Sequence, residues 1–230
     1  GLTADYANVS NSLGMASSPV VSGGVLIVQV ENDSESYTLG LDKKTGVNLW
    51  RLNRPKAANW TSPLPLPGGL VALQSRTGIN AIRVADGSKA WSYDDGASTI
   101  PSTVVSGGVL YIPSHGITAL KLNAADATNT PEQIWRSRRL SPGTASPLVL
   151  GAKVYTVNSA GVVTAGDVKS GERLWQLRLK GPFSASPVAA GAHLFFFNEK
   201  GLMQAVDTRG KEGEITGTLK LDDQILGSPA

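Results

Sequence analysis

The side chains that most often carry chemistry are few in this chain, and those that stand out recur at a fixed spacing. The 230 residues contain no cysteine and only two histidines, His115 and His193. Disulfides and thiolate sites are therefore excluded, and a histidine-rich metal site is disfavoured. The most prominent candidate nucleophiles are serines that precede an apolar run: Ser18, Ser62, Ser102, Ser146, Ser186 and Ser228. No histidine–carboxylate pair accompanies them, and they repeat every 40 to 44 residues, which indicates a structural role in hydrogen bonding between repeats.

The acidic residues also follow the repeat. Asp42, Asp167 and Asp207 occupy one repeat position, where an aspartate is expected to cap the following turn. The segment 31–36 is acidic, but it lacks the ligand spacing of a dedicated calcium loop. We therefore predict no metal site and no catalytic residue. The net charge of +3, from 21 basic and 18 acidic residues, does not favour a nucleic-acid partner.

The repeat predicts four short strands in each unit of about 42 residues. Each serine is followed by a glycine turn, two β-branched or aromatic runs and a strand that contains tryptophan in the first four units. The tryptophans, which stand 11 or 12 residues before the next serine, are Trp50, Trp91, Trp135 and Trp175. Because they share one register, we expect each ring to pack between neighbouring units rather than to bind a ligand.

Four-stranded antiparallel units of this length are typical of β-propeller blades, and a β-sandwich array and a β-helix are the alternatives. The expected blades are about 18–61, 62–101, 102–145, 146–185 and 186–227. Residues 1–17 are interpreted as the tail of a preceding blade and 228–230 as the start of a further one. We thus predict five complete repeats of a propeller. An open ring exposes a strand edge, which predicts self-association.

Three segments carry a resemblance to a known family. GLDKKTGVNLW (40–50) and AGDVKSGERLW (165–175), together with SSPVVSGGVLIV (17–28), resemble the repeat of pyrroloquinoline-quinone-like propellers. That family includes quinoprotein alcohol dehydrogenases and the propeller lipoprotein of the outer-membrane barrel assembly machinery. The resemblance implies a propeller over essentially the whole chain, with the five repeats as part of a ring of seven or eight blades. It also implies a location in the periplasm of a bacterium or secretion from it. Its enzymes hold the quinone between a tryptophan and a vicinal disulfide beside calcium. A chain without cysteine lacks that disulfide, so we expect pyrroloquinoline quinone and calcium only if the full-length protein is an enzyme.

The residues outside the repeat pattern are the better candidates for binding. The loops between one tryptophan strand and the next serine lie on the same side of a meander as the loops between the second and third strands. These loops contain basic and aromatic residues, which are Arg54, Lys56, Trp60, Arg138, Arg139, Lys180 and Phe183. Such a set at a propeller mouth predicts binding of a small anionic ligand or a protein loop, and a solvated rim of mixed charge is the alternative.

The sequence therefore predicts a non-enzymatic binding or scaffold module of the bacterial cell envelope. No apolar run approaches the roughly 18 residues that span a membrane. Two other functions are kept open. One is a fragment of a quinone-dependent oxidoreductase of the alcohol or sugar dehydrogenase type, and the other is a sensor domain fused to a kinase.

Overall fold

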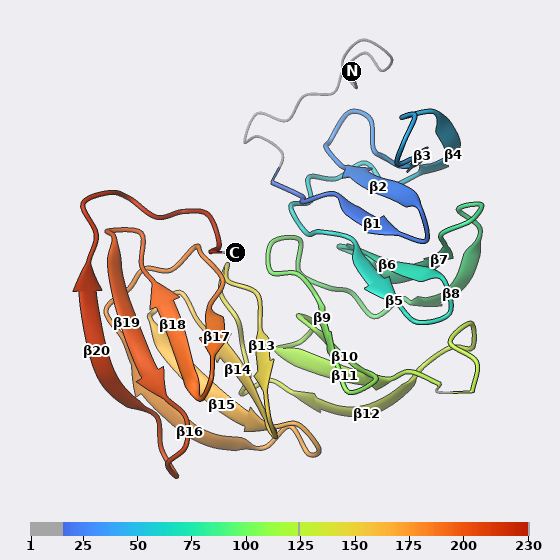
Figure 1. Ribbon diagram of the computed structural model, residues 1–230. Helices are drawn as coiled ribbons and strands as arrows, with labels where there is room; N and C mark the ends of the chain where they lie inside the picture. Colours follow the sequence, from blue (N-terminus) through green and yellow to red (C-terminus); the bar gives the residue numbers. More distant parts are fainter. Residues whose placement is uncertain (1–15, 124, 230) are drawn as a thin grey trace. The chain divides into compact units, whose positions relative to one another are not determined.

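The computed structural model describes residues 16–123 and 125–229, and all regular structure in this part is β-strand (Figure 1). Twenty strands form five four-stranded sheets, each built from four consecutive strands in chain order. The predicted all-β fold of four-stranded antiparallel blades is confirmed. The described residues include no helix that is long and apolar enough to cross a membrane. The predicted N-terminal tail, up to residue 15, and residue 230 lie outside the described residues.

The strands have the following bounds. The first sheet contains β1 (Val20–Ser22), β2 (Val25–Val30), β3 (Tyr37–Asp42) and β4 (Asn48–Asn53). The second contains β5 (Leu64–Leu66), β6 (Leu70–Ser75), β7 (Gly78–Arg83) and β8 (Lys89–Tyr93). The third contains β9 (Val104–Ser106), β10 (Val109–Ile112), β11 (Ile117–Lys121) and β12 (Glu132–Ser137). The fourth contains β13 (Leu148–Leu150), β14 (Lys153–Val157), β15 (Val162–Asp167) and β16 (Arg173–Arg178). The fifth contains β17 (Val188–Ala190), β18 (His193–Phe197), β19 (Leu202–Asp207) and β20 (Glu214–Lys220).

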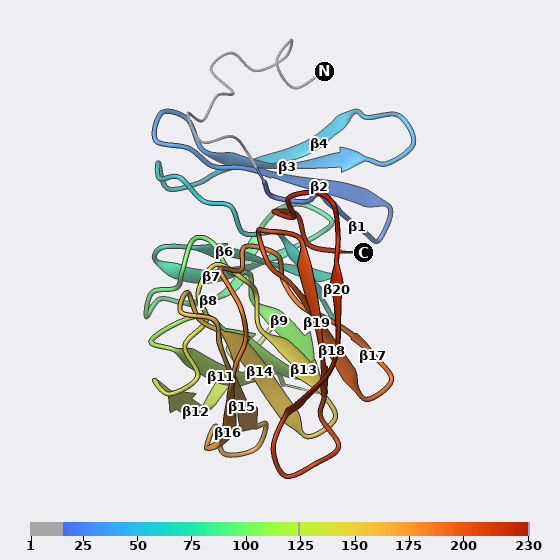
Figure 2. The same ribbon diagram turned by 90° about the vertical axis from the view of Figure 1, so that its left-hand side faces the viewer.

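The chain divides into two compact units. Unit 1 comprises the described residues up to Gly108 together with Leu122–Glu132, and unit 2 comprises Val109–Lys121 together with the described residues from Gln133 onward. Unit 1 contains the first two sheets, and unit 2 contains the last two. The order of the strands within these sheets can be followed in Figures 1 and 2.

A glycine pair makes the first hairpin. Gly23 and Gly24 have φ of 54° and 89°, a backbone region that other residues adopt at a cost. They allow β1 to turn directly into β2, with Ser22 opposite Val25. The alternating run that follows then places Val25 and Ile27 on one face of the sheet, where both are buried.

The core of unit 1 lies between its two complete sheets. Val25, Ile27 and Trp50 of the first sheet pack against apolar side chains of the second, which are Val71, Leu73, Ile82 and Val84. The Trp50 indole crosses this joint, because its Nε1 donates to the Val84 carbonyl at 2.8 Å. A Cβ atom on Gly87 would lie 2.8 Å from the same ring, so the turn between β7 and β8 needs glycine there.

The core of unit 2 repeats this arrangement with different side chains. Tyr155 and Val157 pack with Leu194, Phe196 and Val206 of the last sheet. The Trp135 indole donates to the Val168 carbonyl at 2.9 Å, and in unit 1 the Trp91 indole donates to the Ala127 carbonyl at 3.0 Å.

Trp175 is the exception among the four tryptophans. It packs beside Gly213, where a Cβ atom would lie 2.5 Å from the ring. Its buried Nε1 nevertheless has no hydrogen-bond partner among the described residues. The carbonyl that directly follows β19, that of Thr208, stands where Val84 and Val168 accept from a tryptophan in the other sheets. Here it accepts from Lys153 Nζ instead, at 2.8 Å.

The repeated serines join consecutive first strands. The Ser18 amide donates to Ser62 Oγ at 2.9 Å, and the Ser62 amide donates to Ser102 Oγ at 3.1 Å. In unit 2 the Ser146 amide donates to Ser186 Oγ at 3.0 Å, and the Ser186 amide donates to Ser228 Oγ at 2.9 Å. The hydroxyls of Ser62, Ser102, Ser186 and Ser228 therefore each satisfy a backbone N–H one repeat earlier.

Candidate binding site

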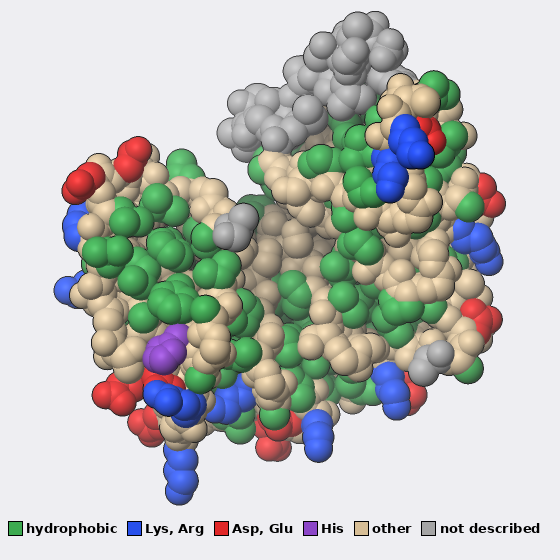
Figure 3. Space-filling view, in the orientation of Figure 1, with side chains coloured by type: hydrophobic (Ala, Val, Ile, Leu, Met, Phe, Trp, Pro, Cys, Tyr) green, Lys and Arg blue, Asp and Glu red, His purple; other side chains and the backbone are tan. Residues whose placement is uncertain are grey.

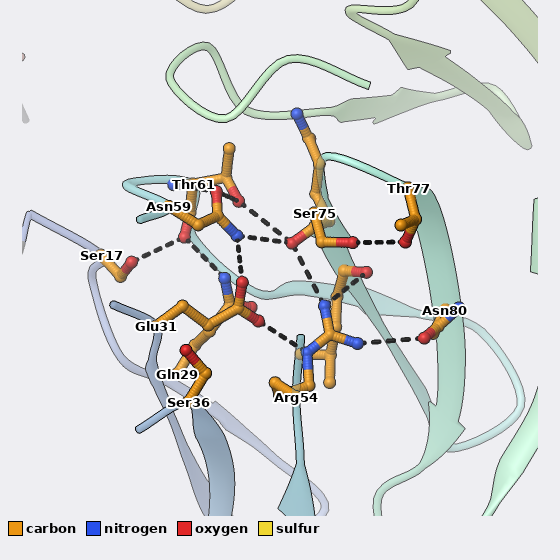
Figure 4. A network of polar contacts seen from close by, with 12 residues as sticks. Ser17, Gln29, Glu31, Ser36, Arg54, Asn59, Thr61, Ser75, Thr77 and Asn80 are labelled. Carbon is orange, nitrogen blue, oxygen red and sulfur yellow. Dashed lines mark hydrogen bonds and ion pairs between the residues drawn. The ribbon is translucent and has the colours of Figure 1, made fainter. Parts of the chain in front are cut away.

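The loop that joins β4 to β5, residues 53–60, carries three of the predicted binding residues, Arg54, Lys56 and Trp60. Arg54 is buried, and its Nε donates to Glu31 Oε1 at 2.6 Å with both side chains 1% exposed (Figure 4). Its other nitrogens donate to Asn80 Oδ1 at 3.0 Å and to the Gln74 carbonyl at 3.3 Å. The Arg54 guanidinium therefore makes its contacts inside unit 1, and of the three predicted binding residues in this loop Lys56 and Trp60 keep exposed surface.

Asn59 completes the same buried cluster. Its Nδ2 donates to Glu31 Oε2 at 2.8 Å and to the Gln74 carbonyl at 2.7 Å. Its Oδ1 accepts from the Thr61 amide and the Thr61 hydroxyl, at 3.2 and 2.9 Å. Both carboxylate oxygens of Glu31 are thus satisfied, and both ends of the loop are tied to one buried group (Figure 4).

Gln74 extends the cluster to the next loop, residues 94–103. Its Oε1 accepts from the amide and the hydroxyl of Thr103, each at 2.7 Å. Its Nε2 donates to the carbonyls of Ser98 and Pro101, at 2.6 and 2.9 Å. This network therefore holds the two loops together. Removing one partner of its buried ion pair should destabilise the protein by about 3–5 kcal/mol, because the other charge would stay buried without compensation.

The exposed part of this region combines apolar and cationic surface. The Trp60 amide donates to the Thr99 carbonyl at 2.8 Å, which sets the partly exposed Trp60 beside the loop 94–103, in which Ile100 is 45% exposed. A groove of about 510 Å³ lies next to the loop and is lined by Ser34, Glu35, Ser36, Arg51, Asn53, Arg54 and Lys56. Lys56 is exposed and Trp60 is partly exposed, so the loop 53–60 offers an ammonium group and an aromatic ring to a partner.

The acidic segment 31–36 is occupied by contacts within the protein. Glu31 holds Arg54, and Glu35 pairs with Arg51 at 2.6 Å. Asp33 Oδ1 accepts from the Ala58 amide at 3.2 Å, which ties this segment to the loop 53–60. These carboxylates therefore position loops.

The repeated aspartates cap turns. Asp42 Oδ1 accepts from the amides of Thr45 and Lys44, at 2.8 and 3.0 Å, and Asp167 Oδ1 accepts from the amides of Ser170 and Lys169, at 2.9 and 2.8 Å. These hydrogen bonds to the charged form, led by those from Thr45 and Ser170, hold the pKa of each carboxyl below its usual range. In Asp207 the Arg209 side chain is the main cause of a lowered pKa.

The other predicted binding residues belong to unit 2. Arg138, Arg139 and Lys180 are exposed. Phe183 is buried and contacts Phe196, with the ring centroids 6.1 Å apart. The backbone of Lys180 is held by Gln204, whose Oε1 accepts from its amide at 2.9 Å and whose Nε2 donates to its carbonyl at 3.0 Å. The binding role of all seven residues stays a prediction, and the exposed members available to a partner are Lys56, Trp60, Arg138, Arg139 and Lys180.

Sequence reasoning missed the cluster around Glu31. Its members lie in three separate segments, and the sequence analysis treated the 31–36 segment only as a weak calcium candidate. One signal was available, because Gln29 and Gln74 occupy the same position of consecutive repeats. A glutamine that recurs in an otherwise apolar strand indicates a hydrogen bond to the next repeat, and Gln74 makes one with Thr103.

The residues present can be compared with the quinone and calcium of the enzymes in the wider propeller family. Calcium needs several oxygen ligands gathered at one point. Within residues 16–123 and 125–229 there is no group of three or more His, Asp or Glu side chains that could hold a metal ion. Trp50 and Trp135 already pack against Gly87 and Gly171. The described part of the chain therefore does not fit a quinone–calcium site.

The fold is similar to several solved structures. BamB from Moraxella catarrhalis aligns with a TM-score of 0.72 at 21% identity, over 91% of this chain and 62% of that one. Quinohemoprotein alcohol dehydrogenase from Comamonas testosteroni gives a TM-score of 0.67 at 15% identity, over 93% of this chain and 44% of that one. The computationally designed protein Ika8 gives 0.65 at 14% identity, over 92% and 64%. At these identities the likeness establishes the fold, and the chain spans less than two thirds of each of these proteins.

The family comparison is more specific. No curated protein matches the chain. A family model described as outer membrane protein assembly factor BamB matches residues 8–116 and 121–216, which is most of the sequence. The chain therefore belongs to the family of outer membrane protein assembly factor BamB.

Proposed function

We propose that this chain is a non-enzymatic, partner-binding scaffold module of the bacterial cell envelope. It binds protein through its loop face, by which we mean the exposed residues of the loops between sheets, Lys56 and Trp60 in unit 1 and Arg138, Arg139 and Lys180 in unit 2. The family supports this assignment, because its name is that of an assembly factor for outer membrane proteins. The proposed location is the periplasm.

The observation that carries the proposal is the rigid presentation of the loop 53–60. A loop that is already fixed before binding loses less conformational entropy on binding than a flexible loop does. The buried contacts of Arg54 and Asn59 hold this loop at both ends, and they leave Lys56 and Trp60 at its surface. Tryptophan, tyrosine and arginine are the residue types most enriched among the side chains that dominate binding at protein interfaces. Trp60 is therefore the expected anchor, and Lys56 adds positive charge to the same loop.

Arg138, Arg139 and Lys180 extend the proposal to unit 2. None of the three side chains is engaged in an ion pair among the described residues. Their charge favours a partner surface that carries carboxylates.

In-cell photocrosslinking tests the proposal. A photoreactive amino acid at position 60 should capture an envelope protein, and Lys56→Ala should lower the yield at least several-fold without lowering the melting temperature. Lys44→Ala is the matched control, because this exposed lysine lies in the turn at the opposite end of its blade. Equal yields from Lys56→Ala and Lys44→Ala would contradict the proposal.

A second candidate function is a fragment of a quinone-dependent alcohol dehydrogenase. The likeness to the Comamonas testosteroni enzyme favours it, since the chain covers only 44% of that protein. Incubating the natural protein with pyrroloquinoline quinone and calcium, then recording its visible absorption and dye-linked alcohol oxidation, separates the two functions. A bound quinone band with activity would support the enzyme.

A further inference from the structure

The outermost strand of the fifth sheet differs from the outer strands of the other four. In those strands a buried tryptophan has a charged residue within two positions, as in the pairs Trp50 and Arg51, Trp91 and Lys89, Trp135 and Arg136, and Trp175 and Arg173. In β20 the corresponding residue is Gly217, which pairs with Ala205 as Trp175 pairs with Ala165. The five residues between Glu214 and Lys220 are uncharged.

The side chains of β20 are largely in solvent. Every residue of the strand except Gly217 is exposed, and Ile215 and Leu219 are 40% and 53% exposed. Natural edge strands are usually blunted by charged residues, proline or a covering element. Here charge stands only at the two ends of the strand, so its central part is an unprotected edge.

The backbone of β20 offers hydrogen bonds on its outer side. The Leu221 amide donates to the Gly201 carbonyl at 2.7 Å, which fixes the alternation of the antiparallel ladder with β19. In such a ladder every second residue points its N–H and C=O away from the partner strand. Counting from Leu221, these residues are Lys220 and Thr218. No other described strand pairs with this edge, because β20 ends the order of its sheet.

The region where β20 ends is acidic. A hollow of about 400 Å³ is lined by Glu199, Lys200, Lys220, Leu221, Asp222, Asp223 and Gln224. Lys220 Nζ donates to the Lys200 carbonyl, so this ammonium is already engaged, and Asp222 and Asp223 are exposed. Figure 3 shows acidic side chains at the tip of this sheet and hydrophobic side chains gathered over its strands.

We propose that β20 is a docking strand for an extended segment of a partner protein, which adds to the sheet antiparallel to β20. The segment would carry β-branched or apolar residues opposite Ile215 to Leu219, where they extend the exposed apolar surface. It would begin with lysine or arginine, because the start of an antiparallel strand meets the end of β20 and its two carboxylates. This surface is separate from the loop residues of the proposed function.

A peptide tests this inference directly. The probe is fluorescein-labelled Lys-Thr-Val-Thr-Val-Thr-Val, measured by fluorescence anisotropy against the 230-residue chain. We expect saturable binding, together with slower hydrogen exchange at the amides of Thr218 and Lys220. The same peptide with alternate amides N-methylated should not bind, because it cannot form the ladder.

Matched variants locate the contact. Thr218→Pro removes only an outward-pointing N–H and should weaken binding about tenfold while leaving the pairing with β19 intact. Gln176→Pro makes the same change at the equivalent position of β16 and should leave the affinity unchanged. Asp222→Lys with Asp223→Lys should weaken binding of this peptide and improve binding of a version that begins with glutamate.

Three results would overturn the inference. The first is equal binding of the N-methylated peptide, and the second is equal affinity of the Thr218→Pro and Gln176→Pro variants in chains whose circular dichroism matches the parent. The third is a dimer in light scattering that Thr218→Pro dissociates and the peptide does not, which would assign the edge to a second copy of the chain.

Discussion

In unit 1 the joint between the sheets β1–β4 and β5–β8 buries an ion pair, whereas in unit 2 the joint between β13–β16 and β17–β20 buries aromatic rings. Both joints use the same repeat features, a serine that bonds to the next serine and a tryptophan that packs on the next glycine turn. They differ at the end of the blade where the loops lie. There unit 1 has Glu31 with Arg54, and unit 2 has Phe183 with Phe196.

This difference separates what holds two sheets together from what positions a loop. Apolar packing is only weakly directional, so the contact between Phe183 and Phe196 stabilises the joint of unit 2, whereas the backbone of Lys180 beside it is held by hydrogen bonds with Gln204. Hydrogen bonds are directional, and those of Glu31, Arg54 and Asn59 fix the loop 53–60 from both ends. The hydrogen-bonded joint of unit 1 is therefore better suited to holding a loop side chain in a defined position.

The largest expected effect comes from opening the polar joint. Arg54→Ala leaves the Glu31 carboxylate buried without its cation, so it should cost about 3–5 kcal/mol. The free energy of opening should be measured from hydrogen exchange of amides in β4 and β6, because repeat proteins unfold one unit at a time.

Two further variants make this test specific. Arg51→Ala breaks the Glu35 pair, whose side chains are 37% and 39% exposed, and should cost less than about 1 kcal/mol. Replacing Glu31 and Arg54 together by Leu and Met should restore most of the stability and still loosen the loop. A similar loss for Arg54→Ala and Arg51→Ala would show that the buried pair has no special role.

The next effect tests the apolar joint. Leu194→Ala removes a fully buried side chain between the last two sheets and should cost about 2–5 kcal/mol in unit 2. Leu174→Ala changes a leucine that is 48% exposed, and it should cost at most about 0.5 kcal/mol. Hydrogen exchange in unit 1 should not respond to either variant, and a response there would contradict the view that each joint is stabilised locally.

A smaller effect separates the tryptophans of the two units. Trp50→Phe leaves the Val84 carbonyl without its donor and should cost about 1–3 kcal/mol beyond the lost ring area. Trp175→Phe removes an indole N–H that has no acceptor among the described residues, so that additional cost should be absent. Calorimetric melting of the two variants gives the difference, and equal losses would mean that the hydrogen bond to Val84 contributes nothing.

The fold was predictable from the sequence because the repeat encodes it locally. The glycine pair at 23–24 and the alternating run from Val25 to Val30 specify a hairpin without reference to any other part of the chain. The same pattern occurs in five copies, so a strand assignment that is ambiguous in one copy can be made from the other four.

The candidate site was less predictable, because its contacts join residues far apart in the sequence. Arg54 lies 23 residues from Glu31, and charged residues in loops read as exposed by default. The sequence therefore placed Arg54 among the exposed binding residues, although it is buried. Phe183 was assigned to the loop face for the same reason, since the pattern of one loop does not reveal that Phe196 lies beneath it.

The smallest effect concerns a feature that the two units share, so it should not distinguish them. Asp42 and Asp167 cap equivalent turns, and their pKa values are lowered by hydrogen bonds to the charged carboxylate. A carboxyl whose pKa is lower in the folded chain contributes stability above its unfolded pKa of about 4, and this contribution is lost as the pH falls through the folded value. We therefore expect melting temperatures to be flat near neutral pH and to fall below about pH 4.

Asp42→Asn and Asp167→Asn should each flatten this acid decline by a similar amount, in unit 1 and unit 2 respectively. A decline that only one of the two substitutions flattens would mean that the turns, like the joints, have diverged between the units.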